Sequence, residues 1–399
     1  MSGPLSGYRI LDLTAMISGP LATQWLADQG ADVIKVEPPA GDLTRSGPNQ
    51  QGGAAAVFLN NNRNKRSLTL DLKQAEARTL LLELAATADV FIQNFRPGVI
   101  DRMGLGEDVV RQHAPDIVYC SISGFGESGP YATQPVYDPL IQALSGLATV
   151  QAGADAERPR LVRTILPDKL TAVATAQALT AALLARERGG PGQHVRISML
   201  DTVLAFLWSS DMAAQTFVGA ESAQQRAASF IDLIYETRDG YISVAVQSNR
   251  EWEALAQALG RAEWLQDPRF ATPALRQEHI DERLALIQDV LLTDEAEAWL
   301  QRLRDAGVPC APVLTRAQVI AHPQVAANDT LILSEHPQAG TLRQARPPAR
   351  FSATPFAEPR PAPALGGDNA DVLGEFGYAA DAIRAMHARG VFGPDTSTG

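Results

Sequence analysis

The sequence predicts an α/β fold, with a doubly wound parallel sheet in a large domain and a smaller α+β domain after it. In the N-terminal half, short apolar segments alternate with helical ones, which is typical of a parallel sheet covered by helices on both faces. Beyond residue 230 the pattern changes to a hairpin signal followed by consecutive helices, which is typical of a separate α+β unit.

Strands of the large domain are predicted where short apolar runs are bounded by turn residues. They cover residues 9–13, 31–37, 67–72, 89–95, 117–122 and 194–197. A helix is predicted after Ser18, whose side chain suits an N-cap and which precedes Gly19-Pro20. Further helices are predicted at 73–86, at 99–113 with a break at residues 104–106, and at 200–217.

The longest predicted helix runs from residue 166 to 188, with Ala172, Ala176, Leu179 and Leu183 on one face. The glycine- and proline-rich residues 189–192 end it. Asp168 lies at its N-cap or first turn, where the free N–H groups and the helix dipole favour an anion. On this evidence alone Asp168 is interpreted as a helix cap, since Asp is a preferred N-cap residue.

Ligands of doubly wound sheets bind beyond the carboxyl ends of the strands, which here selects the loops at 14–19, 94–98 and 123–138. The third loop contains Gly124-x-Gly126-x-x-Gly129, formally a dinucleotide-binding fingerprint. Pro130 and Pro135 follow it, so no helix N-terminus is available for a pyrophosphate and the fingerprint is rejected. We expect a flexible glycine loop instead.

Composition narrows the possible partners. The net charge of −11 argues against nucleic acid and against an anionic membrane surface. No apolar run approaches the roughly 18 residues of a membrane span, and no secretory signal begins the chain. The two cysteines, Cys120 and Cys310, cannot form a disulfide framework and suit a reducing compartment, so a cytoplasmic location is expected. Neither His194 nor His322 has metal-ligand spacing, and no metal is predicted.

The small domain is predicted from a hairpin, 231–235 with 241–246, around Arg238-Asp239-Gly240. Helices follow at 251–260, 277–292 and 293–307, the last with a capping box of Asp294 and Glu297. Trp252, Trp264 and Trp299 are expected in its core. Residues 220–228 are read as a linker, 346–363 as a proline-rich extended strap, 371–386 as a last helix, and the end from 393 as disordered. The predicted boundaries are 1–219, 229–330 and 331–399.

Several motifs, each weak alone, occur here in a specific order over almost the whole chain. They are Leu11-Asp12-Leu13-Thr14, Ser18-Gly19-Pro20, the segment 30–37, Gly41-Asp42-x-Thr44-Arg45, the segments 64–67 and 70–73, Asn94-Phe95-Arg96-Pro97-Gly98, Arg102-Met103-Gly104, and the glycine loop. With this order and spacing the sequence resembles the family III CoA-transferases, a group that includes formyl-CoA:oxalate transferase, carnitine CoA-transferase and α-methylacyl-CoA racemase.

The resemblance implies a large Rossmann-like domain completed by the C-terminal segment, and an interlocked homodimer. It also implies that Asp168 is the catalytic nucleophile of a transferase that moves CoA from an acyl-CoA to a small carboxylic acid, with succinate as one candidate. Coenzyme A thioester is then the substrate, and no tightly bound cofactor is expected. The helix N-terminus at Asp168 is expected to favour its ionised form.

The other roles implied by the resemblance form two groups. Asn94, Phe95, Arg96, Arg102, Leu70 and Lys73 match positions that bind CoA, and arginine suits phosphate because of its planar donors. The acyl or substrate pocket is expected at Ile17, Ser18, Tyr137, Asp138, Gly124 and Gly126, and the glycine loop is expected to shield the intermediate from water.

Two departures from the family pattern bear on specificity. Tyr137-Asp138 stands where the racemases carry a histidine before an aspartate, and tyrosine, with a pKa near ~10, is a poor second base; transferase is therefore favoured over 2-methylacyl-CoA racemase or epimerase. The formyl-CoA transferase pattern has a basic residue where Pro135 stands here and another near Pro38, so oxalate specificity and some contacts on the adenine side are not assigned. A non-catalytic CoA-binding protein is the third alternative.

Overall fold

The computed structural model describes residues 3–220 and 233–393. The chain forms two compact units: one combines residues 1–228 with 330–399, and the other covers residues 229–329. Part of the predicted linker at 220–228 and the residues beyond 393 lie outside the described residues. The two units are described separately below.

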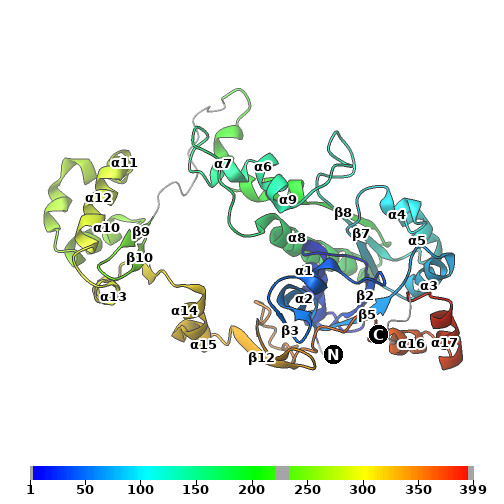
Figure 1. The fold of residues 1–399 in the computed structure, drawn as a ribbon. Helices are drawn as coiled ribbons and strands as arrows, with labels where there is room; N and C mark the ends of the chain where they lie inside the picture. The colour runs from blue at the N-terminus through cyan, green and yellow to red at the C-terminus, as the bar shows by residue number, and fades with distance from the viewer. Residues whose placement is uncertain (1–2, 221–232, 394–399) are drawn as a thin grey trace. The chain divides into compact units, whose positions relative to one another are not determined.

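A six-stranded sheet forms the centre of the first unit (Figure 1). Its strands are β1 (Arg9–Asp12), β2 (Asp32–Glu37), β5 (Lys65–Thr69), β6 (Val90–Gln93), β7 (Val118–Ser123) and β8 (His194–Ser198). They lie in the order β5-β2-β1-β6-β7-β8, and all neighbouring pairs are parallel. The six strands predicted for this domain are confirmed, with ends that differ by a few residues.

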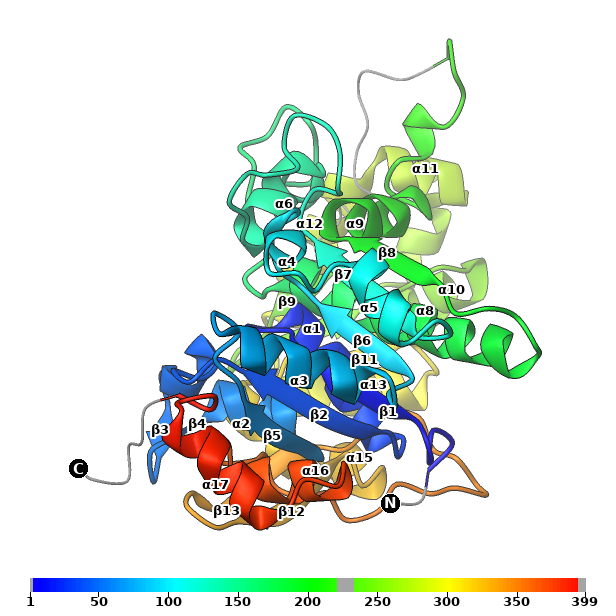
Figure 2. The same cartoon turned by 90° about the vertical axis from the view of Figure 1, so that its right-hand side faces the viewer.

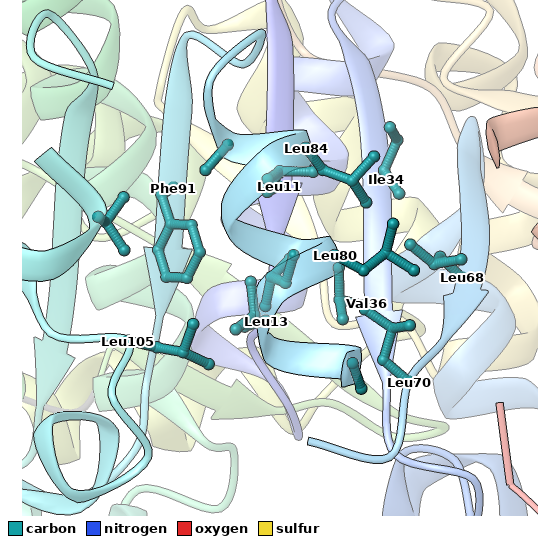
Figure 3. Packing of buried hydrophobic residues seen from close by; sticks show 14 of the residues in the cluster. Leu11, Leu13, Ile34, Val36, Leu68, Leu70, Leu80, Leu84, Phe91 and Leu105 are labelled. Atoms are coloured by element: carbon teal, nitrogen blue, oxygen red, sulfur yellow. The ribbon is translucent and has the colours of Figure 1, made fainter. Parts of the chain in front are cut away.

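Strand residues alternate between two apolar layers, so both faces of the sheet are buried. One face contributes Leu11, Ile34, Phe91 and Tyr119 to a cluster with α3 (Ala75–Ala85), α5 (Glu107–His113) and α16 (Asn369–Glu375). Figure 2 shows α3 and α5 on the viewer's side of the sheet, and Figure 3 shows leucines of α3 among Leu11, Ile34 and Val36.

The opposite face packs against α1 (Ser18–Asp28) and α8 (Leu166–Glu187), which lie side by side (Figure 1). Ile10, Val33 and Val118 contribute from the strands. The predicted long helix is confirmed as α8, and its buried alanines allow the close approach of α1.

The direction in which successive strands are added to the sheet reverses between β1 and β6. The chain runs from β1 outward to β5 and then returns to β6 on the other side of β1. In doubly wound sheets the loops that diverge at such a point form the ligand crevice. The loops in question are 13–17 after β1 and 94–98 after β6, two of the three selected from the sequence.

Shorter elements surround this sheet. They are η1 (Leu43–Ser46), β3 (Gln50–Gln51), β4 (Ala54–Ala55), α2 (Ala56–Asn62), α4 (Val99–Arg102), α6 (Asp138–Leu144), α7 (Leu147–Val150), α9 (Met199–Trp208) and η2 (Ala213–Gln215). The break predicted at residues 104–106 is confirmed between α4 and α5. The helix predicted for 200–217 ends at Trp208 instead, and a 3₁₀ turn follows.

The C-terminal segment packs on the first unit through a hairpin, a strap and two helices. These are β12 (Leu331–His336), β13 (Gly340–Ala345), the irregular residues 346–363, α16 and α17 (Ala380–Ala388). The strap is held at Arg360, whose backbone N–H donates to Oδ1 of Asn64 and whose carbonyl accepts the Asn64 backbone N–H. The last helix predicted at 371–386 is two helices, because the chain turns through Gly377 at φ +84°.

The second unit has a three-stranded antiparallel sheet of β9 (Ile234–Glu236), β10 (Tyr241–Val244) and β11 (Cys310–Pro312). Its helical segments are α10 (Asn249–Ala258), η3 (Ala262–Gln266), η4 (Pro268–Phe270), α11 (Pro273–Glu278), α12 (Ile280–Leu291), α13 (Ala296–Asp305), α14 (Arg316–Ala321) and α15 (Pro323–Ala327). The hairpin and the burial of all three tryptophans are confirmed.

Two details of this unit differ from the sequence expectation. The helix predicted at 277–292 is interrupted at His279, between α11 and α12. The capping box of Asp294 and Glu297 is wrong, because α13 begins at Ala296 with Glu295 at its N-cap. Asp294 pairs with Arg302 instead, and the Ala296 N–H donates to Asp239.

Candidate active site

Asp168 is the third residue of α8. It therefore lies in the first turn of the helix, which was predicted together with the N-cap as an alternative. Its carboxylate is partly buried rather than directed into bulk solvent. Burial, then the nearby Asp138 charge, raises the pKa of Asp168 to about 6, against a smaller lowering by a hydrogen bond from Ser18. Burial and Asp138 thus outweigh the helix end that was expected to favour ionisation. A raised pKa makes the carboxylate more basic while leaving it ionised at neutral pH.

Asp138 is the first residue of α6 and is 4% exposed. One carboxylate oxygen accepts the Asp168 backbone N–H at 3.3 Å, and the other accepts the Gln142 amide at 2.6 Å. Burial raises the pKa of Asp138, against these two hydrogen bonds and the charge of Lys169. Two acidic residues therefore lie together at the start of α8, near enough for the charge of one to raise the pKa of the other, as in sites where one of two carboxylates takes part in the chemistry.

Ser18 approaches Asp168 from α1, and its predicted role as an N-cap is wrong. Helix α1 begins at Ser18 itself, Ile17 occupies the N-cap position, and no side chain caps the helix. The Ser18 side chain, 5% exposed, instead lies close enough to Asp168 to act as a hydrogen-bond donor that lowers the pKa of Asp168. Gly19 is required next to it, because a Cβ there would lie 2.3 Å from Cβ of Thr14.

Four of the six predicted CoA-binding residues line one cavity of about 570 Å³, namely Leu70, Lys73, Phe95 and Arg102. The cavity lies at the carboxyl ends of β1, β2, β5 and β6, since the residues that follow each of these strands line it. Leu70 is fully buried, while Lys73 and Arg102 are exposed. An apolar floor with exposed cations at its rim is suited to a nucleotide with phosphates.

The other two predicted CoA-binding residues have different surroundings. Both ends of the Asn94 amide are bound to the backbone of Ala15, at 3.0 and 2.8 Å. Arg96 is exposed and lines a second cavity of about 520 Å³. Phe95 lines both cavities. The structure therefore groups Arg96 with the second cavity and Asn94 with the loop after β1.

A hydrogen-bonded chain that sequence reasoning missed holds the backbone of Phe95. Gln93 accepts the Phe95 N–H at 2.8 Å and donates to Ser121 at 3.1 Å. The Ser121 hydroxyl lies 2.7 Å from Nε2 of His194, whose Nδ1 lies 2.8 Å from a carboxylate oxygen of Glu107. Polar residues in the buried strands 90–93 and 118–123 are the sequence signal for it.

The glycine loop takes no helical form, which agrees with the rejection of the dinucleotide fingerprint. Gly124 packs against Val136, because a Cβ there would lie 2.4 Å from a Val136 methyl carbon. Gly126 has φ +94°, a conformation that side chains disfavour. Tyr137, at the N-cap of α6, is 66% exposed, unlike its neighbour Asp138.

Buried charges around the loop after β1 are the main group that the sequence did not reveal. Asp12, Lys35, Asp42 and Lys65 are all at most 5% exposed. Burial alone would raise the pKa of Asp12, but Lys65 and Lys35 lower it to about 2. Burial lowers the pKa of Lys65 to about 8 against the Asp12 charge. A charge in the middle of a strand buried on both faces, as in Leu11-Asp12-Leu13, was the available signal.

Within residues 3–220 and 233–393, no three metal-ligating side chains come together. The prediction that no metal is needed stays a prediction. In the same part of the chain, none of the helices combines the length and the apolar character that crossing a bilayer requires.

Comparison with known proteins places this geometry in a family. The sequence model of CoA-transferase family III matches residues 5–369. Human succinyl-CoA:glutarate CoA-transferase is 34% identical over 380 residues, which cover 93% of this chain and 86% of the relative. Acetyl-CoA:oxalate CoA-transferase of Acetobacter aceti is 35% identical over 382 residues, covering 94% and 96%.

A solved structure supports the same assignment. The crystal structure of a CaiB/BaiF family protein from Brucella suis matches with a TM-score of 0.82 and 32% identity, covering 94% of this chain and 100% of that chain. The resemblance drawn from the sequence motifs is confirmed by these matches. The chain belongs to CoA-transferase family III.

Proposed function

We propose that this CoA-transferase moves CoA from an acyl-CoA thioester to a small carboxylic acid through covalent intermediates on Asp168. The observation that carries the proposal is the position of that carboxylate. It is partly buried, lies near the Ser18 hydroxyl and beside Asp138, and has a pKa raised to about 6. A carboxylate nucleophile conserves the activation of the thioester, because an anhydride passes CoA on whereas a serine ester does not.

The transfer takes place in four steps. A carboxylate oxygen of Asp168 attacks the thioester carbonyl, which forms a mixed anhydride and expels CoA thiolate. The thiolate attacks the Asp168 carbonyl, which forms an aspartyl-CoA thioester and releases the donor acid. The acceptor carboxylate attacks this thioester and again frees the thiolate. The thiolate finally attacks the acceptor's carbonyl, so that the new acyl-CoA leaves and the Asp168 carboxylate is restored.

The CoA nucleotide is proposed to bind in the 570 Å³ cavity, with Lys73 and Arg102 at the phosphates and Phe95 and Leu70 against the adenosine. The position of the cavity at the reversal between β1 and β6 supports this, because doubly wound sheets bind ligands there. Arg96 is proposed as a further phosphate contact. Asn94 is proposed to support the site by holding Ala15.

The acyl group is proposed to lie near Ile17 and Ser18, with Tyr137, Asp138, Gly124 and Gly126 on the other side. A small dicarboxylic acid is the proposed class of acceptor. The names of the relatives support it, since succinyl-CoA:glutarate and acetyl-CoA:oxalate CoA-transferases both act on such acids. The exposed Arg163 and Lys169, which flank Asp168 in the chain, could attract the second carboxylate.

Assembly and location complete the proposal. Phe206 and Trp208 of α9 are 48% and 49% exposed, and Val173 of α8 is 41% exposed. Large apolar side chains gathered on neighbouring helices are typical of an interface, and we propose that a second copy covers them in an interlocked homodimer. Both cysteines are free, which supports a cytoplasmic location. Light scattering would test for twice the chain mass of 42.7 kDa.

The test of the mechanism is trapping. Hydroxylamine added with acyl-CoA should convert Asp168 to its hydroxamate, which peptide mass spectrometry would locate. The Asp168→Ala variant should lose exchange between acyl-CoA and carboxylates; full exchange by that variant would refute the assignment. A mass-spectrometric screen of acyl-CoA donors against mono- and dicarboxylate acceptors would identify the substrates, and a preference for monocarboxylates would contradict the proposed acceptor class.

A further inference from the structure

Each of five consecutive backbone polar groups between β1 and α1 is bound by a side chain. In chain order the contacts are Thr14 N–H to Asp12 Oδ1 (2.9 Å), Thr14 carbonyl to Lys35 Nζ (2.8 Å), Ala15 N–H to Asn94 Oδ1 (3.0 Å), Ala15 carbonyl to Asn94 Nδ2 (2.8 Å) and Met16 N–H to Asp42 Oδ1 (3.4 Å). We call residues 14–16 the anchored loop. It cannot shift without breaking several of these hydrogen bonds.

The charged side chains that hold the anchored loop are buried and paired with each other. Lys35 Nζ lies 3.0 Å from Asp42 Oδ2, and both side chains are 1% exposed. The remaining oxygen of Asp42 also accepts the N–H and the hydroxyl of Thr44. A buried ion pair contributes little net stability compared with apolar residues of the same volume, but it fixes geometry because a misplaced partner leaves a buried charge unpaired. The pair is therefore suited to positioning.

The backbone of the anchored loop is itself strained. Met16 has φ +70°, a region that residues with a Cβ rarely occupy outside functional sites. Thr14 additionally packs against the space that a Cβ at Gly19 would fill. Surrounding contacts must hold such a conformation in place, and the side chains of Asp12, Lys35, Asp42 and Asn94 supply them.

The anchored loop ends two residues before Ser18, whose side chain acts on Asp168 and lowers its pKa. Ser18 is the first residue of α1 and makes no capping hydrogen bond, so a shift of the anchored loop would displace it. A connected path thus runs from the Lys35–Asp42 pair, through the backbone of Thr14 and Met16, to the Ser18 hydroxyl and the Asp168 carboxylate.

We propose that Lys35 and Asp42 are positioning residues, which hold the anchored loop in the one conformation that keeps the Ser18 hydroxyl on the Asp168 carboxylate. The inference rests on the proposed function of Asp168 for its consequence in catalysis, but the placement of Ser18 is a property of the free protein. The charged group that acts on Asp168 from its surroundings is Asp138 of α6, and Lys169 of α8 acts in turn on Asp138.

The expected effect is on the titration of Asp168. The Ser18 hydrogen bond lowers the pKa of Asp168, so releasing the loop removes that lowering and the pKa rises. In Lys35→Met/Asp42→Asn, which replaces the ion pair by neutral groups of similar shape, the acid limb of kcat should move to higher pH. At pH 6 a rise of up to about one pKa unit would lower the ionised fraction of Asp168 from about one half to about one tenth, so kcat should fall by up to roughly fivefold, by more than KM for acyl-CoA changes.

The matched control is the buried pair of Arg63 and Asp28, 2.8 Å apart, in which Asp28 is the last residue of α1. Arg63→Met/Asp28→Asn makes the same chemical change at the other end of that helix and should leave the acid limb in place. A second comparison uses Ser18→Ala, which should itself move the limb to higher pH. Adding the Lys35 and Asp42 changes to Ser18→Ala should move it no further.

Carboxyl titration of Asp168 by ¹³C NMR, assigned against Asp168→Asn, gives the same quantity without activity. A wild-type protein that exchanges no CoA would therefore overturn the proposed function and leave this test in force. The positioning role is overturned if the paired variant titrates like wild type, if the control pair shifts equally, or if the shift persists in full without Ser18. If the paired variant does not fold, Asp42→Glu takes its place, because it keeps the charge but lengthens the side chain. This variant must raise the pKa of Asp168 for the proposal to stand.

Discussion

The backbone N–H of Asp168 donates to a carboxylate oxygen of Asp138, 3.3 Å away. The same Asp138 charge raises the pKa of the Asp168 side chain. One acidic residue thus holds the start of α8 and makes the neighbouring carboxylate more basic. This double role lets a single variant separate the electrostatic effect from the structural one.

The rate should depend on the ionisation of Asp168. Because its pKa is about 6 rather than the usual 3.8, kcat should rise with pH through about 6 and level off above it, where the nucleophile is ionised. Asp138→Asn removes the charge that opposes ionisation, so the acid limb should move to lower pH by roughly one unit. The measurement is kcat from pH 5 to 8. A limb that stays in place would show that Asp138 acts only through α8.

A substitution that removes the Asp168 charge should stabilise the folded protein, although it should abolish activity. A carboxyl group with a raised folded-state pKa binds protons more readily when folded, so its stability contribution is lost as pH rises from about 3.8 to about 6. Asp168→Asn removes this loss and should stabilise the protein by on the order of 1–2 kcal/mol at pH 7.5. Solvent at the partly exposed carboxylate limits the value.

The check on this prediction is its pH dependence. The difference in free energy of unfolding between Asp168→Asn and wild type should shrink as pH falls from 7.5 to 4.5, where both folded and unfolded Asp168 are increasingly protonated. Denaturant unfolding at several pH values measures it. A difference independent of pH would point to packing at Asn rather than to the charge.

The cations at the rim of the 570 Å³ cavity should affect binding more than chemistry. Lys73→Met and Arg102→Met each remove one charge proposed to contact CoA phosphate, and each should raise KM for acyl-CoA roughly tenfold with a smaller change in kcat. An acyl-pantetheine substrate lacks the nucleotide, so variants and wild type should use it equally well. Arg261→Met, at an exposed site in the second unit, is the control.

The racemase alternative makes its own prediction. Racemisation needs a second base on the opposite face of the α-carbon, and Tyr137, which stands where the racemases have histidine, is 66% exposed. Incubation of a 2-methylacyl-CoA in deuterium oxide without acceptor acid should therefore give no deuterium at the α-carbon. Wash-in that depends on Asp168 would restore the racemase interpretation.

Local patterns predicted most of the regular structure in the first unit. The strands of its sheet and helix α8 could be read from apolar runs and turn residues, because each is fixed by its own burial. Small or polar-rich elements such as α2 and the hairpin of β12 and β13 were missed. Their packing depends on residues distant in sequence, for example Gln344 against Leu59.

The site was predictable in part, for a related reason. Asp168 and the loops at 94–98 and 123–138 follow from position in the chain and from family motifs. The influence of Ser18 on Asp168 did not follow, since the sequence suggested a cap and a place in the acyl pocket, and only the approach of α8 brings Ser18 near Asp168. The pairing of Lys35 with Asp42 depends on where the chain turns after β2, which no local periodicity reveals.

Gly124 should control access of water to the proposed intermediates. A Cβ at this position would lie 2.4 Å from a Val136 methyl carbon, so Gly124→Ala must displace the loop proposed to shield the anhydride. We expect transfer to fall roughly tenfold and hydrolysis of acyl-CoA without acceptor to rise relative to transfer. High-performance liquid chromatography of free CoA and product thioester gives both rates from one reaction.

The double variant Gly124→Ala/Val136→Ala separates the clash from any other effect of the new methyl group. It removes the two closest atoms but keeps Cβ of Val136, 2.8 Å from the added carbon, so the ratio of hydrolysis to transfer should return only part of the way to wild type. Gly374→Ala, at a helical glycine with open space around it, should leave the ratio unchanged. If Gly124→Ala slows transfer without raising the hydrolysis ratio, the loop positions substrate and does not exclude water.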